Sequence, residues 1–331
     1  MRILFIGGTG TISMAISQKL VDEGHELYLL NRGNRKNELE GANYIIVDIN
    51  DEIKVKDIIE DMSFDVVADF IAYTPKDVER DYRLFNKKTK QYIFISSTSA
   101  YQKPPVSHIF TESTPLHNPY WKYSEEKMNC EEFLMEKYRT EQFPVTIVRP
   151  SHTYDNRKLP IGFHGDIGSW QTVKRMIEGK EVIIPGDGTS IWTLTHNTDF
   201  AKGFVGLVGN AHAIGEAFHI TSDELLTWNQ IHQIIADAVG VELKAFHIAT
   251  DTLIRHSKYD LLGSIIGDKT NSAIFDNSKL KRVVPDYVAT KRFDQGAKEA
   301  VEYILAHENL QQEDKEFDEF CDDIIARIKS L

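Results

Sequence analysis

Tyr123 and Lys127 stand four residues apart in the stretch from Trp121 to Lys127. On a helix, side chains with this spacing lie on the same face. An ammonium group beside a tyrosine hydroxyl favours the phenolate and lowers the pKa of the hydroxyl. Free tyrosine titrates near ~10, so a base that works near neutral pH needs a shift of roughly 3 units, or about 4 kcal/mol. The pair is therefore typical of a group that moves a proton while a cofactor moves a hydride.

Two other pairs have the same spacing, Tyr154/Lys158 and Tyr287/Lys291. The first lies in a loop just before a proline, where helical geometry is not expected. The second follows a proline and is far along the chain from the nucleotide-binding half. Sequence position therefore favours Tyr123/Lys127 as the working pair.

Short apolar runs alternate with helical patterns through the first half of the chain. Strands are predicted at Ile3–Ile6, Leu27–Leu30, Tyr44–Val47, Val66–Ile71, Tyr92–Ile95 and Val145–Val148. Helices are predicted over about 12–24, Asp51–Met62, Asp77–Lys87 and Asn118–Tyr138. Strands that are almost entirely apolar and alternate with helices predict an α/β fold with a parallel sheet covered on both faces.

After Arg149-Pro150 the alternation becomes looser. Helices are predicted at about 168–179, 197–209, 227–239, 293–307 and 313–329, with strands at 181–184, 191–195 and 217–220. A chain of 331 residues exceeds the size at which single cores stop growing, so a second domain is expected. We predict a Rossmann-type, doubly wound domain over 1–150. A smaller α/β substrate domain over 151–331 would be interleaved with it, because no Gly/Ser linker separates them.

A glycine-rich turn joins the first strand to the first helix, in the order Phe5-Ile-Gly-Gly-Thr-Gly-Thr-Ile-Ser13. Gly7 and Gly10 allow a tight turn and close approach of a pyrophosphate, and the helix that follows presents N–H groups to the anion. We expect Gly7, Gly10, Thr11 and Ile12 to bind a dinucleotide. Ser13 replaces the usual third glycine, and it is small enough for close packing of helix on strand.

The end of the second strand carries Asn31 and Arg32, with Arg35 close behind. Enzymes that use NAD usually place an acid here for the ribose 2′-hydroxyl. An arginine can instead hold a 2′-phosphate, so the sequence predicts NAD(P) with NADP favoured. Asp48, after the third strand, is either an acceptor for the adenine amino group or a capping residue.

Four hydroxyl residues, Ser96 to Ser99, follow the fifth strand. The carboxyl ends of strands in such sheets face the ligand crevice. A hydroxyl from this run and the Tyr123/Lys127 pair would converge over one face of a cofactor.

With these motifs, the chain resembles the extended or atypical short-chain dehydrogenases/reductases of the NAD-dependent epimerase/dehydratase type. The resemblance rests on Gly7–Gly10, Ser96-Ser97…Tyr101, Tyr123–Lys127, Arg149-Pro150…Tyr154 and Gly186-Asp-Gly188…Asp199. It implies that Tyr123 is the acid/base and that Lys127 binds the nicotinamide ribose and lowers the tyrosine pKa. It also implies that Ser97 orients the substrate oxygen, and that Asp199 is structural.

Two departures from the motifs of this family narrow the expected class of substrate. Thr98-Ser99 stands where sugar dehydratases of this kind carry an Asp-Glu pair, which argues against a 4,6-dehydratase. Trp192 stands near the place where many nucleotide-sugar enzymes have an arginine, so a nucleotide diphosphate would lose one clamp. Arg157, Lys158 and His164 are either substitutes for that clamp or solvated side chains.

Net charge, cysteine content and the length of the apolar runs argue against several classes of protein. A net charge of −12 disfavours general binding to nucleic acid or to an anionic membrane. Cys130 and Cys321 are too few for a disulfide framework, and no apolar run is long enough to span a membrane, so a cytoplasmic protein is expected. His152, His164 and His196 lack metal-ligand spacing, and no metal site is predicted.

We therefore expect an oxidoreductase or epimerase that acts on a hydroxyl or carbonyl of a small sugar-like or nucleotide-sugar molecule. The resemblance also implies a homodimer through helices at about 77–88 and 118–138. The alternative is a non-catalytic nucleotide sensor or RNA-binding member, as among the chloroplast stem-loop-binding proteins.

Overall fold

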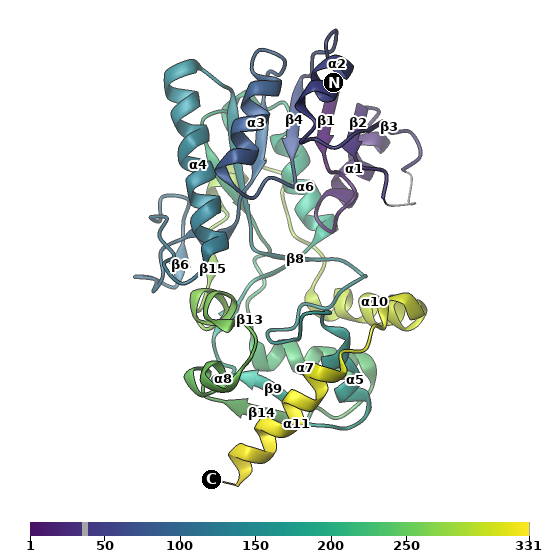
Figure 1. Ribbon diagram of the computed structural model, residues 1–331, viewed down its shortest axis with the longest axis vertical. Helices are drawn as coiled ribbons and strands as arrows, with labels where there is room; N and C mark the ends of the chain where they lie inside the picture. Colours follow the sequence, from purple (N-terminus) through teal and green to yellow (C-terminus); the bar gives the residue numbers. More distant parts are fainter. Residues whose placement is uncertain (35–38, 331) are drawn as a thin grey trace.

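The computed structural model describes residues 1–34 and 39–330, and it is built as two lobes stacked end to end (Figure 1). One lobe holds a seven-stranded sheet in the order β12-β7-β5-β4-β1-β2-β3, in which every neighbouring pair is parallel. The strands are β1 (Arg2–Ile6), β2 (Glu26–Asn31), β3 (Asn43–Ile46), β4 (Val66–Asp69), β5 (Tyr92–Ile95), β7 (Val145–Pro150) and β12 (Ala217–Ile220). The predicted parallel sheet is confirmed.

Helices cover both faces of this sheet. On one face lie α1 (Ser13–Asp22) and α6 (Asn197–Leu207); on the other lie α2 (Glu52–Ile58), α3 (Pro75–Phe85) and α4 (Lys122–Glu141). Successive strand residues point to opposite faces. In β1, Ile3 and Phe5 join the core under α1 and α6, whereas Leu4 and Ile6 join the core under the other helices. This alternation explains why the strands are apolar throughout.

The chain after residue 150 contributes to both lobes. The segment 197–220 supplies α6 and the edge strand β12, so the large sheet is not completed within the first 150 residues. The second lobe has its own apolar cores. It is built from α5 (Trp170–Ile177), β9 (Val182–Pro185), β10 (Ile191–Trp192), β13 (Leu226–Thr227), α7 (Trp228–Val239), β14 (Ala245–Ile248), α8 (Thr250–His256), α10 (Phe293–Leu305) and α11 (Lys315–Lys329).

Short elements form the waist between the lobes. The pairs are β8 (His152–Tyr154) with β11 (Leu194–His196) and β6 (Ile109–Phe110) with β15 (Ile274–Phe275). The π-helical segment η3 (Leu262–Lys269) and the single turn η1 (Thr98–Ala100) complete this region. Helix α9 (Ser278–Val283) and the turn η2 (Ala211–Ala213) pack in the core of the large sheet, and the turn η4 (Glu308–Leu310) follows α10. Figure 1 shows β8 crossing the waist. In the described part of the chain, no helix is long and apolar enough to cross a bilayer.

Candidate functional site

The glycine turn after β1 has the backbone that its sequence demands. Gly7 and Gly8 have φ values of +102° and +87°, which side chains rarely allow. A Cβ on Gly8 would also stand 2.5 Å from a methyl carbon of Leu29. The Ser13 hydroxyl accepts a hydrogen bond from Gly10 N at 2.8 Å. The serine in place of the third glycine therefore braces the turn as well as fitting under the strand.

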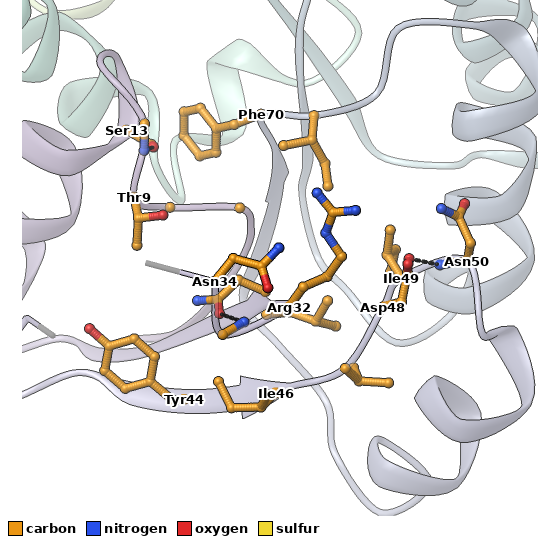
Figure 2. A pocket seen from close by; sticks show the side chains of 18 of the residues that line it. Thr9, Ser13, Arg32, Asn34, Tyr44, Ile46, Asp48, Ile49, Asn50 and Phe70 are labelled. Atoms are coloured by element: carbon orange, nitrogen blue, oxygen red, sulfur yellow. Dashed lines mark hydrogen bonds between the residues drawn. The ribbon is translucent and has the colours of Figure 1, made fainter. Parts of the chain in front are cut away.

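A cavity of about 800 Å³ opens above this turn, at the carboxyl ends of β1, β2 and β4. It lies where the strand order reverses around β1, the usual place for a ligand in such sheets. Of the residues predicted to bind a cofactor, Gly7, Gly10, Arg32 and Asp48 line it (Figure 2). Thr11, Ile12 and Lys127 are not among its lining residues.

Arg32 extends its guanidinium into the cavity (Figure 2). Within residues 1–34 and 39–330 it has no hydrogen-bond or ion-pair partner, which leaves its donors available to a ligand. Asp48 accepts a hydrogen bond from Asn50 N at 3.0 Å within the turn after β3, whereas the N-cap of α2 is Asp51. Asn31 accepts from Gly33 N at 2.8 Å and holds the turn that carries Arg32. Arg35 lies outside the described residues.

Tyr123 and Lys127 occupy the start of α4 on one face, as their spacing predicts. The Lys127 ammonium is buried and donates to Ala72 O and Ile95 O, each at 2.7 Å. It lies 4.7 Å from the ring centroid of Tyr73 and 5.8 Å from that of Tyr123. Because Tyr73 lines the cavity, the pair lies directly behind the cavity wall. Two of the three ammonium donors are used, so one remains.

The expected lowering of the Tyr123 pKa is wrong for the protein alone. Burial raises the pKa of Tyr123 to about 12, and a hydrogen bond with Ser97 opposes part of that rise. Burial also lowers the pKa of Lys127 to about 8. The ammonium is drawn toward two carbonyl oxygens rather than the phenol, so desolvation dominates at the tyrosine.

A row of hydroxyl groups runs from Tyr123 into the interior. Ser97 bonds Tyr123. The Ser97 and Ser99 oxygens are 2.8 Å apart, and Ser124 donates to Ser99 at 2.9 Å. Asn118 donates to Ser124 at 3.3 Å. Asn118 and Ser124 are buried functional candidates that sequence reasoning missed, because nothing in their spacing shows that they meet Ser99. We call Ser97, Ser99 and Ser124 the serine relay.

In the two other Tyr/Lys pairs, the tyrosine is buried in the protein core. Tyr287 is 2% exposed and donates to Thr221 O at 2.8 Å. Tyr154 is 3% exposed and lies in β8, while Lys158 follows in an exposed loop. Asp199, in α6, accepts from Lys291 N at 2.7 Å and joins two segments of the chain, as a structural role requires.

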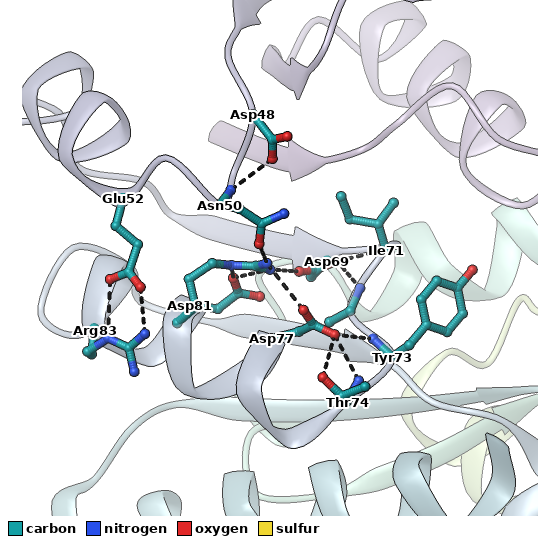
Figure 3. A network of polar contacts seen from close by, with 12 residues as sticks. Asp48, Asn50, Glu52, Asp69, Ile71, Tyr73, Thr74, Asp77, Asp81 and Arg83 are labelled. Atoms are coloured by element: carbon teal, nitrogen blue, oxygen red, sulfur yellow. Dashed lines mark hydrogen bonds and ion pairs between the residues drawn. The ribbon is translucent and has the colours of Figure 1, made fainter. Parts of the chain in front are cut away.

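A buried polar network fixes the loop that carries Tyr73 (Figure 3). Asp69, at the end of β4, accepts from Ile71 N and Ala72 N at 2.5 and 2.8 Å. Arg80 bonds Asp81 at 2.8 Å and also lies 3.5 Å from Asp69. Asp69 is fully buried, is not a lining residue of the cavity and is paired with Arg80.

Two later segments of the chain touch the glycine turn at Thr11. Asn197, which begins α6, donates to Thr11 O at 3.0 Å, and Arg157, paired with Asp155 after β8, reaches the Thr11 hydroxyl at 3.5 Å. Thr11 thus joins the glycine turn to the second half of the chain. No group of His, Cys, Asp and Glu in the described ranges is arranged to hold a metal ion.

Comparisons with known proteins agree with this architecture. The model of the NAD dependent epimerase/dehydratase family matches residues 3–221. The chloroplast stem-loop binding protein of 41 kDa b from Arabidopsis thaliana is 27% identical over 254 residues, covering 72% of this chain and 63% of that protein. A UDP-glucose 4-epimerase from Lactobacillus helveticus is 31% identical over 153 residues, covering 40% of this chain and 46% of that enzyme. The matches thus span less than two thirds of either relative.

Among solved structures, a dTDP-glucose 4,6-dehydratase from Bacillus anthracis, in complex with NAD, has the same fold. The TM-score is 0.74 at 19% identity, and the match covers 93% of this chain and 98% of that one.

Proposed function

This chain belongs to the NAD dependent epimerase/dehydratase family, and we propose that it is an NAD(P)-dependent oxidoreductase or epimerase acting on a hydroxyl or carbonyl group of a sugar-like or nucleotide-sugar substrate. The single observation that carries this proposal is the position of Tyr123. Its ring lies 6.1 Å from that of Tyr73, which lines the cavity set on the glycine turn, and Lys127 and Ser97 lie beside it.

The cavity residues fit a dinucleotide. Gly7 and Gly8 leave no side chain between the backbone and a pyrophosphate, and the cavity is of the size that cofactor sites have. The nicotinamide, when bound, accepts or returns a hydride. Lys127 would use its remaining N–H donor on the adjoining ribose, since its other two donors are held by carbonyl oxygens.

Tyr123 transfers the proton. In the oxidising direction it takes the proton of a substrate hydroxyl, and in the reducing direction it returns a proton to the carbonyl oxygen. Ser97 hydrogen-bonds the same oxygen while its charge changes. Oxidation followed by re-reduction on the other face gives epimerisation, and one direction alone gives net oxidoreduction.

NADP is the favoured form of the cofactor. Arg32 is exposed in the cavity wall and has no partner among the described residues, and no acid replaces it at the end of β2. A 2′-phosphate would give its guanidinium a charge-assisted partner.

A binding screen tests the proposal. The chain is titrated with NAD(H), NADP(H) and a panel of nucleotide sugars, and reduction of the bound nicotinamide is followed by absorbance. We expect saturable binding of a dinucleotide and turnover with at least one sugar. A chain that binds no dinucleotide would contradict the proposal.

RNA binding is the second candidate, and the observation that favours it is the 27% identity to a stem-loop binding protein. The net charge of −12 opposes it, since phosphate binding depends on basic surfaces. Salt-dependent RNA binding without cofactor turnover would support this candidate over the enzyme.

We also propose a homodimer through α3 and α4, which pack against each other on one face of the sheet. Light scattering tests it, with twice the chain mass expected and a monomer as the contrary result.

A further inference from the structure

Lys127 is enclosed, although the proposed function requires its ammonium to reach a ligand. Only 2% of the residue is exposed. Carbonyl oxygens hold two of its three N–H donors. Three aromatic rings surround the rest of the group, with centroids at 4.7 Å for Tyr73, 4.8 Å for Phe94 and 5.8 Å for Tyr123. A ribose can therefore meet the third donor only if one of these rings moves.

Tyr73 is the ring with room to move. Phe94 is fully buried in β5, and Tyr123 is carried by α4. Tyr73 is 52% exposed and lies in the loop after β4. Among the residues that the structure describes, none bonds its hydroxyl. The ring can thus turn aside without breaking a hydrogen bond, and it gives up only its contacts with Lys127 and Tyr123.

The backbone that carries this ring is fixed. Tyr73 N and Thr74 N donate to the Asp77 carboxylate at 3.0 and 2.8 Å. Asp69 accepts from the N–H groups of the two residues before Tyr73, and the ring points away from this network (Figure 3). Motion is therefore confined to the side chain. Exposed side chains turn on the picosecond-to-nanosecond timescale, so no movement of the loop is needed.

The order of the strands places Tyr73 on the path of a dinucleotide. Neighbouring strands run β2-β1-β4-β5. After their carboxyl ends come, in the same order, Arg32, the glycine turn, Tyr73 and the Ile95 carbonyl that bonds Lys127. A dinucleotide with its pyrophosphate at the glycine turn and its adenosine half toward Arg32 extends its other half past Tyr73 to reach Lys127. The cavity agrees with this order, because Arg32 and Tyr73 line it and Lys127 does not.

We propose that Tyr73 is a gate between the cofactor cavity and the Tyr123/Lys127 pair. The inference rests on the proposed function, because it takes the nicotinamide half of a dinucleotide to Lys127. The adenosine half enters the open cavity without any change at Tyr73. The Tyr73 ring then turns aside, and the ribose replaces it at the third donor of the ammonium. In the free protein the ring shields Lys127 from water.

Acylation of lysines tests the gate without any cofactor. The full chain is treated with acetic anhydride, and peptide mass spectrometry follows each lysine. Tyr73→Ala removes the ring, whereas Tyr73→Phe keeps it. Tyr303→Ala is the matched control, because Tyr303 in α10 is also partly exposed, at 39%. Lys103, which is 4% exposed, reports whether the protein has loosened generally.

We expect Tyr73→Ala to raise the acylation rate of Lys127 at least about tenfold while that of Lys103 stays unchanged. In Tyr73→Phe and Tyr303→Ala, Lys127 should react as slowly as in wild type. An unchanged Lys127 rate in Tyr73→Ala would overturn the inference. Equal gains at Lys127 and Lys103 would also overturn it, because the effect would then not be local.

Ligand binding tests the order of entry. Stopped-flow fluorescence follows the association of NADPH and of NADH, and adenosine 2′,5′-bisphosphate supplies the adenosine half alone. A closed gate admits a ligand only to the open fraction of molecules, so we expect Tyr73→Ala to speed association of the tighter-binding dinucleotide at least about threefold. The Kd of the bisphosphate should stay within about twofold of the wild-type value.

Equal or slower dinucleotide association in Tyr73→Ala would overturn the gate, because the ring would then not stand in the way. A chain that binds neither NADPH nor NADH counts against the proposed function. The acylation rates still decide in that case whether the Tyr73 ring closes access to Lys127.

Discussion

The Ser124 hydroxyl donates a hydrogen bond to the Ser99 hydroxyl oxygen across 2.9 Å. Ser99 accepts this bond and so keeps its own hydrogen for another acceptor, and the Ser97 oxygen lies 2.8 Å away. When Ser99 donates to Ser97, the Ser97 hydrogen is available to Tyr123, and a hydrogen bond with Ser97 lowers the pKa of that phenol. This arrangement of the serine relay stabilises the phenolate.

Replacing Ser124 with alanine should make Tyr123 a weaker acid. Ser99 could then turn its hydrogen away, and the donated bond at the phenol would weaken. We expect kcat to fall about three- to tenfold and the basic limb of the rate–pH profile to move up by roughly 0.5–1 unit, with KM little changed. Ser113→Ala, at an exposed position, is the control. An unchanged profile would show that the relay does not act on Tyr123.

Arg32→Ser should change cofactor choice. The guanidinium has no other described partner, so its removal costs only contacts with a ligand. We expect the NADPH dissociation constant to rise at least about tenfold while that of NADH changes less than about twofold. Arg255→Ser, at a 70% exposed site, is the control. Equal effects on both cofactors would argue against a 2′-phosphate contact.

Arg80→Met should destabilise the protein strongly. Arg80 is 5% exposed and faces the fully buried Asp69 and Asp81. Loss of the cation leaves buried carboxylates without compensation, at a cost of about 3–5 kcal/mol in the free energy of unfolding. Arg83→Met removes an exposed pair with Glu52 and should cost less than about 1 kcal/mol. Urea unfolding measures the loss of stability in both variants. Similar losses would show that Arg80 does not compensate the two buried carboxylates.

The burial of His232 leads us to expect that the protein loses stability in mild acid. It is fully buried in α7, and burial lowers its pKa from 6.5 to about 4. The unfolded chain takes up the proton below about 6.5 and the folded chain does not, so stability falls as pH drops from about 6.5 to about 4. The loss due to this group is about 3 kcal/mol. Urea unfolding at pH 7 and 4.5 measures this loss. Between these two pH values, the free energy of unfolding of His232→Leu should fall less than that of wild type or of His212→Asn, the control at an exposed position. If the stability of His232→Leu falls as much with pH as that of wild type, His232 is not the source of the acid sensitivity.

The large sheet could be predicted because its strands are buried on both faces. The predicted strand at Tyr92–Ile95 matches β5, and others differ only at their ends. Helix α4 begins at Lys122 rather than Asn118, because the Asn118 side chain bonds Ser99 O and Gly267 O and a proline follows it. The strand at 217–220 was expected among the second-half elements but joins the edge of the large sheet.

The site was predictable only in part. The glycine turn and the Tyr123/Lys127 pair are local patterns, and local patterns are visible in a sequence. The meeting of Ser99 with Ser124, and the position of Tyr73 beside Lys127, depend on contacts between distant segments. The raised pKa of Tyr123 depends on burial, which spacing cannot report.

The most direct test of the central claim is single-turnover hydride transfer in Tyr123→Phe, measured by nicotinamide absorbance with the cofactor bound at saturation. Tyr138→Phe, on the same helix α4, is the matched control. If Tyr123 carries the proton, the rate falls at least about a hundredfold while the cofactor dissociation constant stays within about twofold. A Tyr123→Phe protein that binds the cofactor and keeps most of its rate would contradict the account.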